Sequence, residues 1–284
     1  MNRKHLSKSA WAALIGKWVF LAVMIIFTVY PVDYTVLGSL KTNAELTQGG
    51  GFLPQEWHFE NYYKAFVQAD FTQYTLNSVI VSVSVTFLAV ATCSLAGFIL
   101  ARREFAGKKL LMALYMSMMF VSLGSVTLYP IYELLRTLKI NKTILALVIA
   151  LTGGQATNVF LVMGFTKGIP KELDEAAIID GCSIYGVYSR IILPLSKPIL
   201  AVVALFSFRN AWNDYITSLI MTISMPKLQT LTVAVVQLKY SVNAAAEWHI
   251  MLAGASIAII PILIVYLLAN KQFIAGLTAG AVKG

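Results

Sequence analysis

Residues 71–101 read FTQYTLNSVIVSVSVTFLAVATCSLAGFILA, an apolar run without a single Asp, Glu, Lys or Arg. The run is longer than the roughly 20 residues that an α-helix needs to cross the hydrocarbon layer of a bilayer. Lipid offers no hydrogen-bond partners, so a segment inside it must bond its own backbone amides, and this run is too long for a barrel strand. The stretch therefore predicts a transmembrane helix.

Five further apolar segments accompany this one along the chain. Three of them contain long runs without charged side chains, whereas the first carries Asp33 and the fifth carries Lys197, Arg209 and Asp214. We interpret all of them as helices, for the same reason of backbone bonding. The sequence predicts an all-α integral membrane protein with one transmembrane domain over residues 1–284 and spans at about 17–40, 71–101, 109–132, 143–166, 193–221 and 250–270.

Composition excludes a soluble protein. Hydrophobic residues make up 58% of the chain and charged residues 12%, against roughly 25% charged residues in a soluble domain. After Tyr30 the chain continues with Pro-Val-Asp-Tyr and shows no small-residue processing site, so we expect the first span to be retained. Cys93 lies in a span and Cys182 in a loop, which implies no disulfide framework.

Basic residues predict the orientation of the chain. They cluster at the amino terminus and in the loop at 102–109, and basic residues mark the cytoplasmic side of a membrane. Both termini are therefore expected in the cytoplasm, although the basic loop at 133–142 goes against this rule. The net charge of +9 is assigned to orientation and lipid headgroups, and nucleic-acid binding is not expected.

The loop between the fourth and fifth spans, residues 168–198, predicts a short cytoplasmic helix. Pro170 suits a first helical turn, and the three acids that follow it suit the positive end of a helix dipole. We expect the helix to end at Gly186 or in the run to Arg190, and Pro194 and Pro198 to mark the turn into the fifth span. Four small or short residues are expected to form a narrow strip that another protein could approach, namely Ala176, Ala177, Asp180 and Gly181.

This loop resembles the EAA loop of ABC importer permeases, in which Glu-Ala-Ala, three residues, Gly, nine residues, Ile, one residue and Leu-Pro follow one another. The resemblance implies a type I importer permease fold with a coupling helix that docks in a cleft of a cytoplasmic ATPase. A surface helix that only closes a loop is the alternative. The residues implied in coupling are Glu175, Ala176, Ala177, Asp180, Gly181, Tyr185, Tyr188, Ile191, Leu193 and Pro194, although relatives often carry other aromatics at the two tyrosines.

Several shorter stretches are similar to the second permease of maltose-type oligosaccharide importers. They are residues 30–41, 61–66, 129–132, 141–143, 212–214 and 273–284. The resemblance implies a bacterial inner-membrane permease with a homologous second permease, two ATPases, a sugar-binding protein and membrane lipid as partners. ATP and magnesium would be bound by the ATPases, and no cofactor or metal is expected in this chain. In relatives the cytoplasmic tail, here 271–284, reaches the ATPases, which implies contacts by Gly280, Val282, Lys283 and Gly284.

Residues 151–155, Leu-Thr-Gly-Gly-Gln, resemble the signature sequence of ABC ATPases. We regard this as coincidence, because the stretch lies in an apolar span and the chain has no Gly-x-x-x-x-Gly-Lys-Ser/Thr phosphate loop. The glycines Gly153 and Gly154 indicate either a close helix contact or a local break that lines the path.

Polar residues inside the spans are the candidates for the substrate path. Such groups are costly in lipid unless they face a cavity or each other. Arg209 and Asp214 could pair with each other or contact sugar, and interhelical hydrogen bonds are an alternative for Asn77, Gln155 and Asn158. The path candidates are Asn158, Arg209, Asn213 and Asp214.

The sequence thus predicts a permease subunit of an ATP-driven, binding-protein-dependent carbohydrate importer. The three histidines have no metal-ligand spacing and no nucleophile nearby, so an enzyme is not expected. The alternatives are an ABC permease for a non-sugar solute, a self-sufficient secondary transporter and a membrane scaffold without transport.

Overall fold

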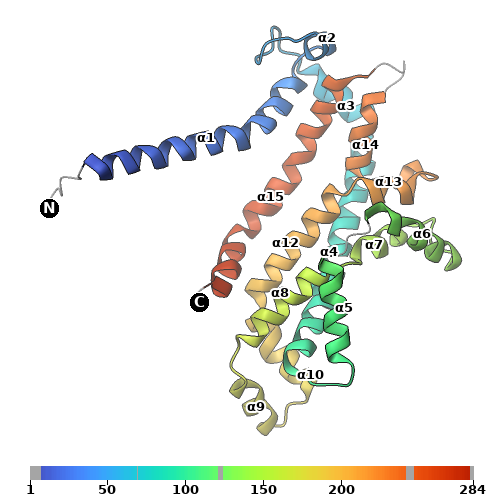
Figure 1. The fold of residues 1–284 in the computed structure, drawn as a ribbon. Coiled ribbons are helices and arrows are strands. Elements are labelled where there is room, and N and C mark those ends of the chain that lie inside the picture. Colours follow the sequence, from blue (N-terminus) through green and yellow to red (C-terminus); the bar gives the residue numbers. More distant parts are fainter. Residues whose placement is uncertain (1–7, 69, 121–123, 241–245, 282–284) are drawn as a thin grey trace. The chain divides into compact units, whose positions relative to one another are not determined.

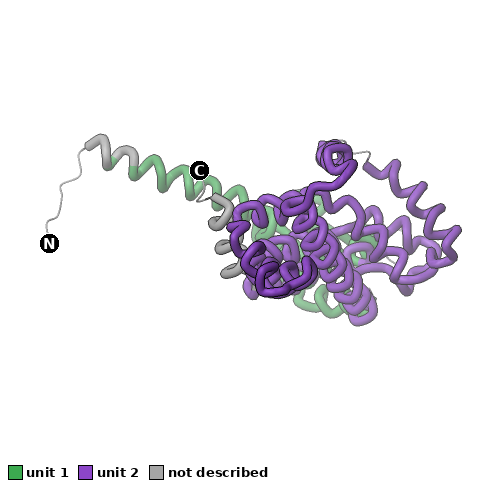
Figure 2. Tube along the Cα trace, turned by 90° about the horizontal axis from the view of Figure 1, so that it is seen from below, with its two compact units in different colours: residues 1–69, 235–257 green, residues 70–234, 258–284 purple. Residues whose placement is uncertain are grey.

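The computed structural model describes residues 8–68, 70–120, 124–240 and 246–281, and every regular element in these ranges is a helix (Figure 1). The chain divides into two compact units, which Figure 2 distinguishes by colour. Unit 1 consists of Met1–Ala69 and Val235–Ile257, and unit 2 consists of Asp70–Ala234 and Ala258–Gly284.

Unit 1 is built on polar anchors that join short helices to the ends of long ones. The side chain of Asn61, which is 2% exposed, donates to the carbonyl oxygens of Ser39 at 2.8 Å and Lys41 at 3.0 Å. Asn43 accepts from the N–H of Trp248 at 3.0 Å and donates to the Ala246 carbonyl at 2.8 Å. The elements are α1 (Lys8–Ser39), α2 (Asn43–Thr47), α3 (Glu60–Gln68), η4 (Leu238–Tyr240) and the start of α15 (Trp248–Ala281).

Unit 2 contains the remaining helices, most of which are short. They are α4 (Phe71–Arg102), α5 (Lys108–Phe120), η1 (Gly124–Thr127), α6 (Leu128–Thr137), α7 (Ile144–Thr152), α8 (Ala156–Lys167), α9 (Glu172–Ile179), α10 (Ile184–Val187), the π turn η2 (Tyr188–Ile192), α11 (Leu193–Leu195), α12 (Lys197–Asn213), α13 (Ile216–Thr222), η3 (Pro226–Leu228) and α14 (Leu231–Gln237), whose last turn passes into unit 1.

Helix α4 is the central element of unit 2. It packs against α8, α12 and α7, and its Gly97 allows close approach to Val162 of α8. Cys93 of α4 and Val162 of α8 lie in one buried cluster with Val202 and Val203 of α12. In lipid, helices associate through such close packing of small side chains.

The first turns of α4 are bonded to the residues that precede and begin α14. Asn77, which is buried, donates to the carbonyl oxygens of Lys227 at 2.8 Å and Gln229 at 2.9 Å. The Ser78 hydroxyl accepts from the N–H of Leu231, the first residue of α14, at 2.8 Å. The amide of Asn77 therefore serves the interhelical role that the sequence left as one alternative.

Six spans were predicted, but among the described residues only three single helices are long and apolar enough to cross a bilayer. They are Leu14–Ser39, Phe71–Arg102 and Trp248–Leu268. Two bent pairs raise the number to as many as five, namely Ile144–Thr152 with Ala156–Lys167 and Ile184–Leu195 with Lys197–Asn213.

The region predicted as a third span, 109–132, is not a single helix. Helix α5 is 13 residues long, and a 3₁₀ turn and α6 follow after residues 121–123, which lie outside the described residues. Gly124 has a φ of +54°, a left-handed conformation that ends regular helix and that glycine adopts at little cost. The charge-free run did not reveal this interruption.

The region predicted as a fifth span, 193–221, is also interrupted. Helix α12 ends at Asn213, and Asp214 takes an extended conformation with ψ 126°. The Asp214 carboxylate accepts from the backbone N–H of Ser218 at 2.7 Å and from its hydroxyl at 2.9 Å. Aspartate thus offers the first turn of α13 a side-chain acceptor and stops the preceding helix.

Candidate functional site

The EAA loop, residues 168–198, begins with α9 (Glu172–Ile179). The first turn of α9 contains the carboxylates of Glu172, Asp174 and Glu175. Negative charge is favourable there because the free N–H groups of the first turn give it a partial positive charge. The three acids therefore stand in the first turn as predicted, whereas Pro170, which was predicted to suit that turn, lies before the helix.

The end of α9 lies earlier than predicted. Gly181 has a φ of +83°, and the N–H of Cys182 donates to the Ala177 carbonyl at 2.9 Å. A left-handed glycine with this bond closes a helix by satisfying its last carbonyl groups. The prediction that Gly186 or the run to Arg190 ends the helix is wrong, because Gly181 already supplies the terminating conformation.

Ala177 faces its own chain. Its side chain is 6% exposed and packs in a buried cluster with Phe98, Ile169, Val187 and Ile192. Gly181 lies beyond the helix and is exposed. The predicted strip of Ala177 and Gly181 as a shared docking face is therefore wrong, because the left-handed turn separates the two residues and Ala177 is covered.

The outward face of the loop is apolar instead. Helix α9 leaves Ala176, Glu175 and Asp180 exposed, and large apolar side chains stand beside them. Large exposed apolar patches on a protein surface mark interaction sites. The apolar side chains of this face, between 43% and 86% exposed, are Leu173, Ile178, Ile179, Ile184 and Tyr185.

The second half of the loop packs inward. Tyr188 donates or accepts a hydrogen bond with Ser94 of α4 at 2.7 Å, and its ring lies 5.3 Å from that of Phe98. Ile191 packs on the cluster around Ala177, and Leu193 packs on the α4–α8–α12 cluster. Three of the predicted coupling residues, Tyr188, Ile191 and Leu193, therefore attach the loop to the rest of the subunit.

The loop joins the next span through an irregular turn. The N–H of Leu193 bonds the carbonyl of Tyr188 five residues back, which makes 188–192 a π turn. Pro194 and Pro198 have no N–H to continue a helical ladder, and the axis bends by 77° between Ile184–Leu195 and Lys197–Asn213. The bend lies where the two prolines predicted the turn into the fifth span.

An ion pair that the sequence analysis missed joins α4 to α9. Arg102 Nε lies 2.8 Å from Asp174 Oδ2, and Arg102 Nη2 donates to the Ile169 carbonyl at 2.8 Å. The side chains of Arg102 and Asp174 are 4% and 16% exposed. In the sequence, Arg102 indicated only the orientation of the chain. The local signs of the ion pair are a basic residue at the end of a span and an acid in the first turn of a nearby helix.

Asn158, a predicted path residue, is bonded within the subunit. Its side-chain amide donates to Gln155 Oε1 at 2.5 Å and to Ser207 Oγ of α12 at 3.3 Å. The residue is buried. These bonds favour the interhelical role for Asn158 and Gln155.

The other predicted path residues lie on or next to the C-terminal half of α12. Arg209 and Asn213 are exposed, and Arg209 donates to the side chain of Asn210 at 3.2 Å. The structure does not pair Arg209 with Asp214, whose carboxylate is bonded to Ser218 instead. An exposed guanidinium and two exposed amides thus share the end of this helix.

The non-helical residues 153–155, between α7 and α8, lie at a cavity of about 510 Å³ in unit 2. Gly154 has a φ of +70°, and a β-carbon there would meet no atom within 4 Å. Of the two roles left open for the glycines, a local break fits this geometry and a close helix contact at Gly154 does not. Helices α7 and α8 are bent by 55° at this point, and Thr92, Tyr115 and Gln155 are among the lining residues.

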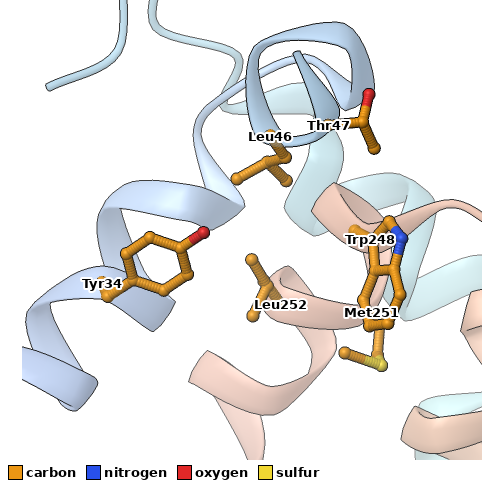
Figure 3. A pocket seen from close by; sticks show the side chains of 6 residues that line it. All are labelled: Tyr34, Leu46, Thr47, Trp248, Met251 and Leu252. Atoms are coloured by element: carbon orange, nitrogen blue, oxygen red, sulfur yellow. The ribbon is translucent and has the colours of Figure 1, made fainter. Parts of the chain in front are cut away.

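A second cavity of about 340 Å³ lies within unit 1 (Figure 3). Figure 3 shows Tyr34 of α1 across the cavity from Trp248 and Met251 of α15, with Leu46 and Thr47 of α2 above. Its lining has no charged side chain. The polar groups among its lining side chains are the Tyr34 and Thr47 hydroxyls and the Trp248 indole N–H.

One of the four predicted tail contacts, Gly280, lies in α15. Helix α15 continues to Ala281 and includes Gly280, so the tail predicted at 271–284 begins as a continuation of the last span. Val282, Lys283 and Gly284 lie outside the described residues.

Comparison with known proteins gives one family. Residues 93–275 match the family described as binding-protein-dependent transport system inner membrane component. The probable ABC transporter permease protein YurM of Bacillus subtilis is 32% identical over 94% of this chain and 88% of its own length. The arabinooligosaccharides transport system permease protein AraQ of Halalkalibacterium halodurans is 30% identical over 100% of both chains.

A solved structure shares the fold. A chain in the crystal structure of a bacterial ABC transporter involved in the import of the acidic polysaccharide alginate superposes with a TM-score of 0.79. The similarity covers 94% of this chain and 99% of that one at 21% sequence identity.

Proposed function

Because this chain belongs to the family of binding-protein-dependent transport system inner membrane components, we propose that it is one permease subunit of an ATP-driven carbohydrate importer. It forms half of the translocation channel, and a homologous permease forms the other half. As a multi-pass inner-membrane protein it has no phosphate loop anywhere in its sequence. The free energy for transport therefore comes from partner ATPase subunits, which bind ATP and magnesium.

The observation that carries this proposal is the outward face of α9. A cytoplasmic surface that exposes Ile178 and Ile179 beside Glu175 is costly unless a partner covers it. The inward side of the same helix, at Ala177, is packed on the subunit. Such a helix can pass displacement from a protein docked on one side to the helices packed on the other.

The proposed transport cycle shifts the channel between an inward-open and an outward-open state. The ATPases bind one state more tightly when ATP closes them, and that difference in affinity is what moves the equilibrium. An extracytoplasmic binding protein delivers cargo to the outer loops. Its docking favours the outward-open state by the same rule.

Carbohydrate is proposed as cargo from the relatives. One relative is named for arabinooligosaccharides, another is the maltodextrin transport system permease protein MdxG of Bacillus subtilis, and the similar solved structure concerns alginate. An importer of a non-sugar solute would share the ATPase docking loop, so the cargo has to be tested separately. A self-sufficient secondary transporter would need no ATPase.

The polar end of α12 is proposed to line the substrate path. An exposed Arg209 is costly against lipid, so the face that carries Arg209, Asn210 and Asn213 must meet water, cargo or a partner. Hydroxyl groups of a saccharide match both the guanidinium and the amide donors. Asp214 and Asn158 are already bonded within the subunit and support this face from behind.

Orientation follows from the same scheme. Both termini and α9 lie in the cytoplasm, so that α15 carries the chain end toward the ATPases. We propose that Gly280, Val282, Lys283 and Gly284 contact the ATPase pair.

Isolation of the intact assembly tests the proposed function. The chain is tagged and purified in mild detergent with its genomic neighbours co-expressed, and the co-purifying subunits are identified by mass spectrometry. The expected result is two ATPase copies, a second permease, and ATP-dependent uptake in proteoliposomes when a saccharide-loaded binding protein is added. Purification without any ATPase, or uptake that persists without ATP, contradicts the proposal.

A further inference from the structure

Arg102 occupies an unusual place at the inner end of α4. Its side chain is 4% exposed, although it is the last residue of a membrane-spanning helix and could extend into water. Arginine near a helix end normally reaches for the interface. Here the guanidinium is folded under the EAA loop instead.

The guanidinium connects two successive parts of that loop. Nη2 donates to the carbonyl of Ile169 in the turn before α9, and Nε lies 2.8 Å from Asp174 in the first turn of α9. The other carboxylate oxygen of Asp174, Oδ1, is buried and has no hydrogen-bond partner within the described residues. Arg102 is thus the charge partner on which the burial of Asp174 depends.

Packing reinforces the same connection one turn further on. Ala177 lies one turn after Asp174 and is buried against Phe98 of α4, which is one turn before Arg102. Two contacts spaced along both helices fix orientation as well as distance. Helix α9 is therefore attached to α4 at two levels.

The covalent route from α9 to α12 is less direct. It passes through the left-handed Gly181, the π turn at 188–192 and a bend of 77° before α12 begins. π turns and proline breaks are positions at which helices bend. A displacement of α9 would be absorbed there before it reached α12 along the chain.

We propose that Arg102 and Asp174 are positioning residues for coupling, and that they make α4 the helix that receives the displacement of α9. This inference rests on the proposed function and adds the route within the subunit. From α4 the movement passes to α8 and α12, which pack along it. The guanidinium transmits force because its ion pair with Asp174 is buried and its Nη2 is hydrogen-bonded to the Ile169 carbonyl, so that α9 and the end of α4 move as one body.

The test uses Asp174→Asn, which keeps the side-chain shape and removes one charge, and Arg102→Gln, which removes one charge and shortens the side chain. Glu172→Gln and Arg103→Gln are the matched controls, since they remove the same charges from adjacent positions outside the pair. Each is prepared as the complete assembly in proteoliposomes, and saccharide uptake and ATP hydrolysis are measured on the same sample. Hydrogen exchange of the α9 amides is measured in parallel.

The expected result is a fall of about fivefold or more in saccharide molecules moved per ATP, the lower end of typical coupling factors, with the ATPase still bound. The α9 amides exchange faster in both pair variants, and the controls keep the wild-type ratio. Arg102→Lys, which retains the charge, restores part of the ratio. The double variant loses no more than either single one, because both remove the same contact.

A purely structural role gives a different pattern. Uptake and ATP hydrolysis then fall together with the amount of assembly, and their ratio stays at the wild-type value, which overturns the inference. Unchanged exchange of the α9 amides in Asp174→Asn overturns it as well, and this readout needs no transport. A wild-type assembly without ATP-driven saccharide uptake contradicts the proposed function instead, and the exchange result then decides the attachment of α9 by itself.

Discussion

Gly97 of α4 lies directly against Val162 of α8. A β-carbon on Gly97 would come within 2.7 Å of the Val162 Cβ and within 2.9 Å of the backbone nitrogen of Met163. Backbone cannot move aside as a flexible side chain can, so only glycine fits this crossing. Gly97 directly precedes Phe98, on which the EAA loop packs. The contact therefore joins α4 to α8 next to the place where the loop is attached to α4.

Gly97→Ala tests this crossing. Overpacking of a close contact destabilises by about 1–3 kcal/mol, so the purified subunit should lose cooperative thermal stability in detergent. Gly164→Ala is the control, because a β-carbon at Gly164 of α8 meets no atom within 4 Å. Equal melting temperatures for the two variants would show that the helices do not cross as described.

Gly181→Ala tests the end of α9. A non-glycine residue in the left-handed region costs about 1–2 kcal/mol, and the strain acts in the turn that directly follows α9. We expect reduced uptake and ATP hydrolysis that depends less on the binding protein. Gly181→Asn should lie between Ala and wild type, since asparagine tolerates this conformation better. If Ala and Asn variants behave alike, the φ of +83° is not the cause.

Ile179→Asp tests the outward face as an ATPase docking surface. Ile179 is 86% exposed, so its replacement should leave the subunit folded and weaken ATPase binding by about tenfold, or ~1.4 kcal/mol. The affinity is measured by diluting the complex in detergent and determining how much ATPase stays bound to the subunit at each concentration. The control is Ile223→Asp, an isoleucine 68% exposed after α13. Undiminished retention with Ile179→Asp would remove the main support for docking through α9.

Arg209→Gln tests the proposed path. Loss of a charged hydrogen-bond donor should raise the saccharide concentration for half-maximal uptake by about tenfold, with the assembly intact. Arg209→Lys keeps the charge but loses the planar fork of donors, so it should recover only part of the affinity. Arg136→Gln is the control, because Arg136 pairs with Glu133 within α6, away from α12 in the sequence. An assembly that dissociates in Arg209→Gln would instead assign Arg209 to the contact with the second permease.

The environment of Glu45 predicts that the local stability of α2 and the following loop in unit 1 depends on pH. Hydrogen bonds from the backbone N–H groups of Thr42 and Gln55 hold the pKa of the Glu45 carboxyl below its ordinary value of 4.5. A lowered pKa means that the ionised form stabilises the fold above pH 4.5, and that this contribution is lost as the pH falls through the lowered pKa.

Hydrogen exchange at α2 and residues 48–55 should therefore accelerate below pH 4.5, after correction for the intrinsic rate. Glu45→Gln should exchange faster already at pH 7 and should lose the pH dependence. Glu56→Gln, in the same loop, is the control. A pH dependence that survives in Glu45→Gln would assign the effect to another group.

The sequence located the spans of this protein because the signal is local. A long apolar run marks each of α1, α4 and α15, since the residues of a span have to be compatible with lipid. The acidic first turn of α9 was predictable for the same reason, because Glu172, Asp174 and Glu175 act on the turn in which they stand. Local signals also misled, since the apolar runs at 109–132 and 193–221 do not reveal breaks that glycine conformation and the Asp214 side chain create.

The amino-acid sequence by itself thus determined an all-helical membrane protein with an EAA loop, because hydrophobicity and motif spacing are properties of contiguous residues. Only the tertiary structure decided that Ala177 is covered, that Ile179 faces outward and that Arg102 binds Asp174. These facts depend on which distant residues meet, and many pairings of the same residue types would satisfy the same local rules. Burial makes one pairing favourable, and burial exists only once α4, α8 and α12 have packed.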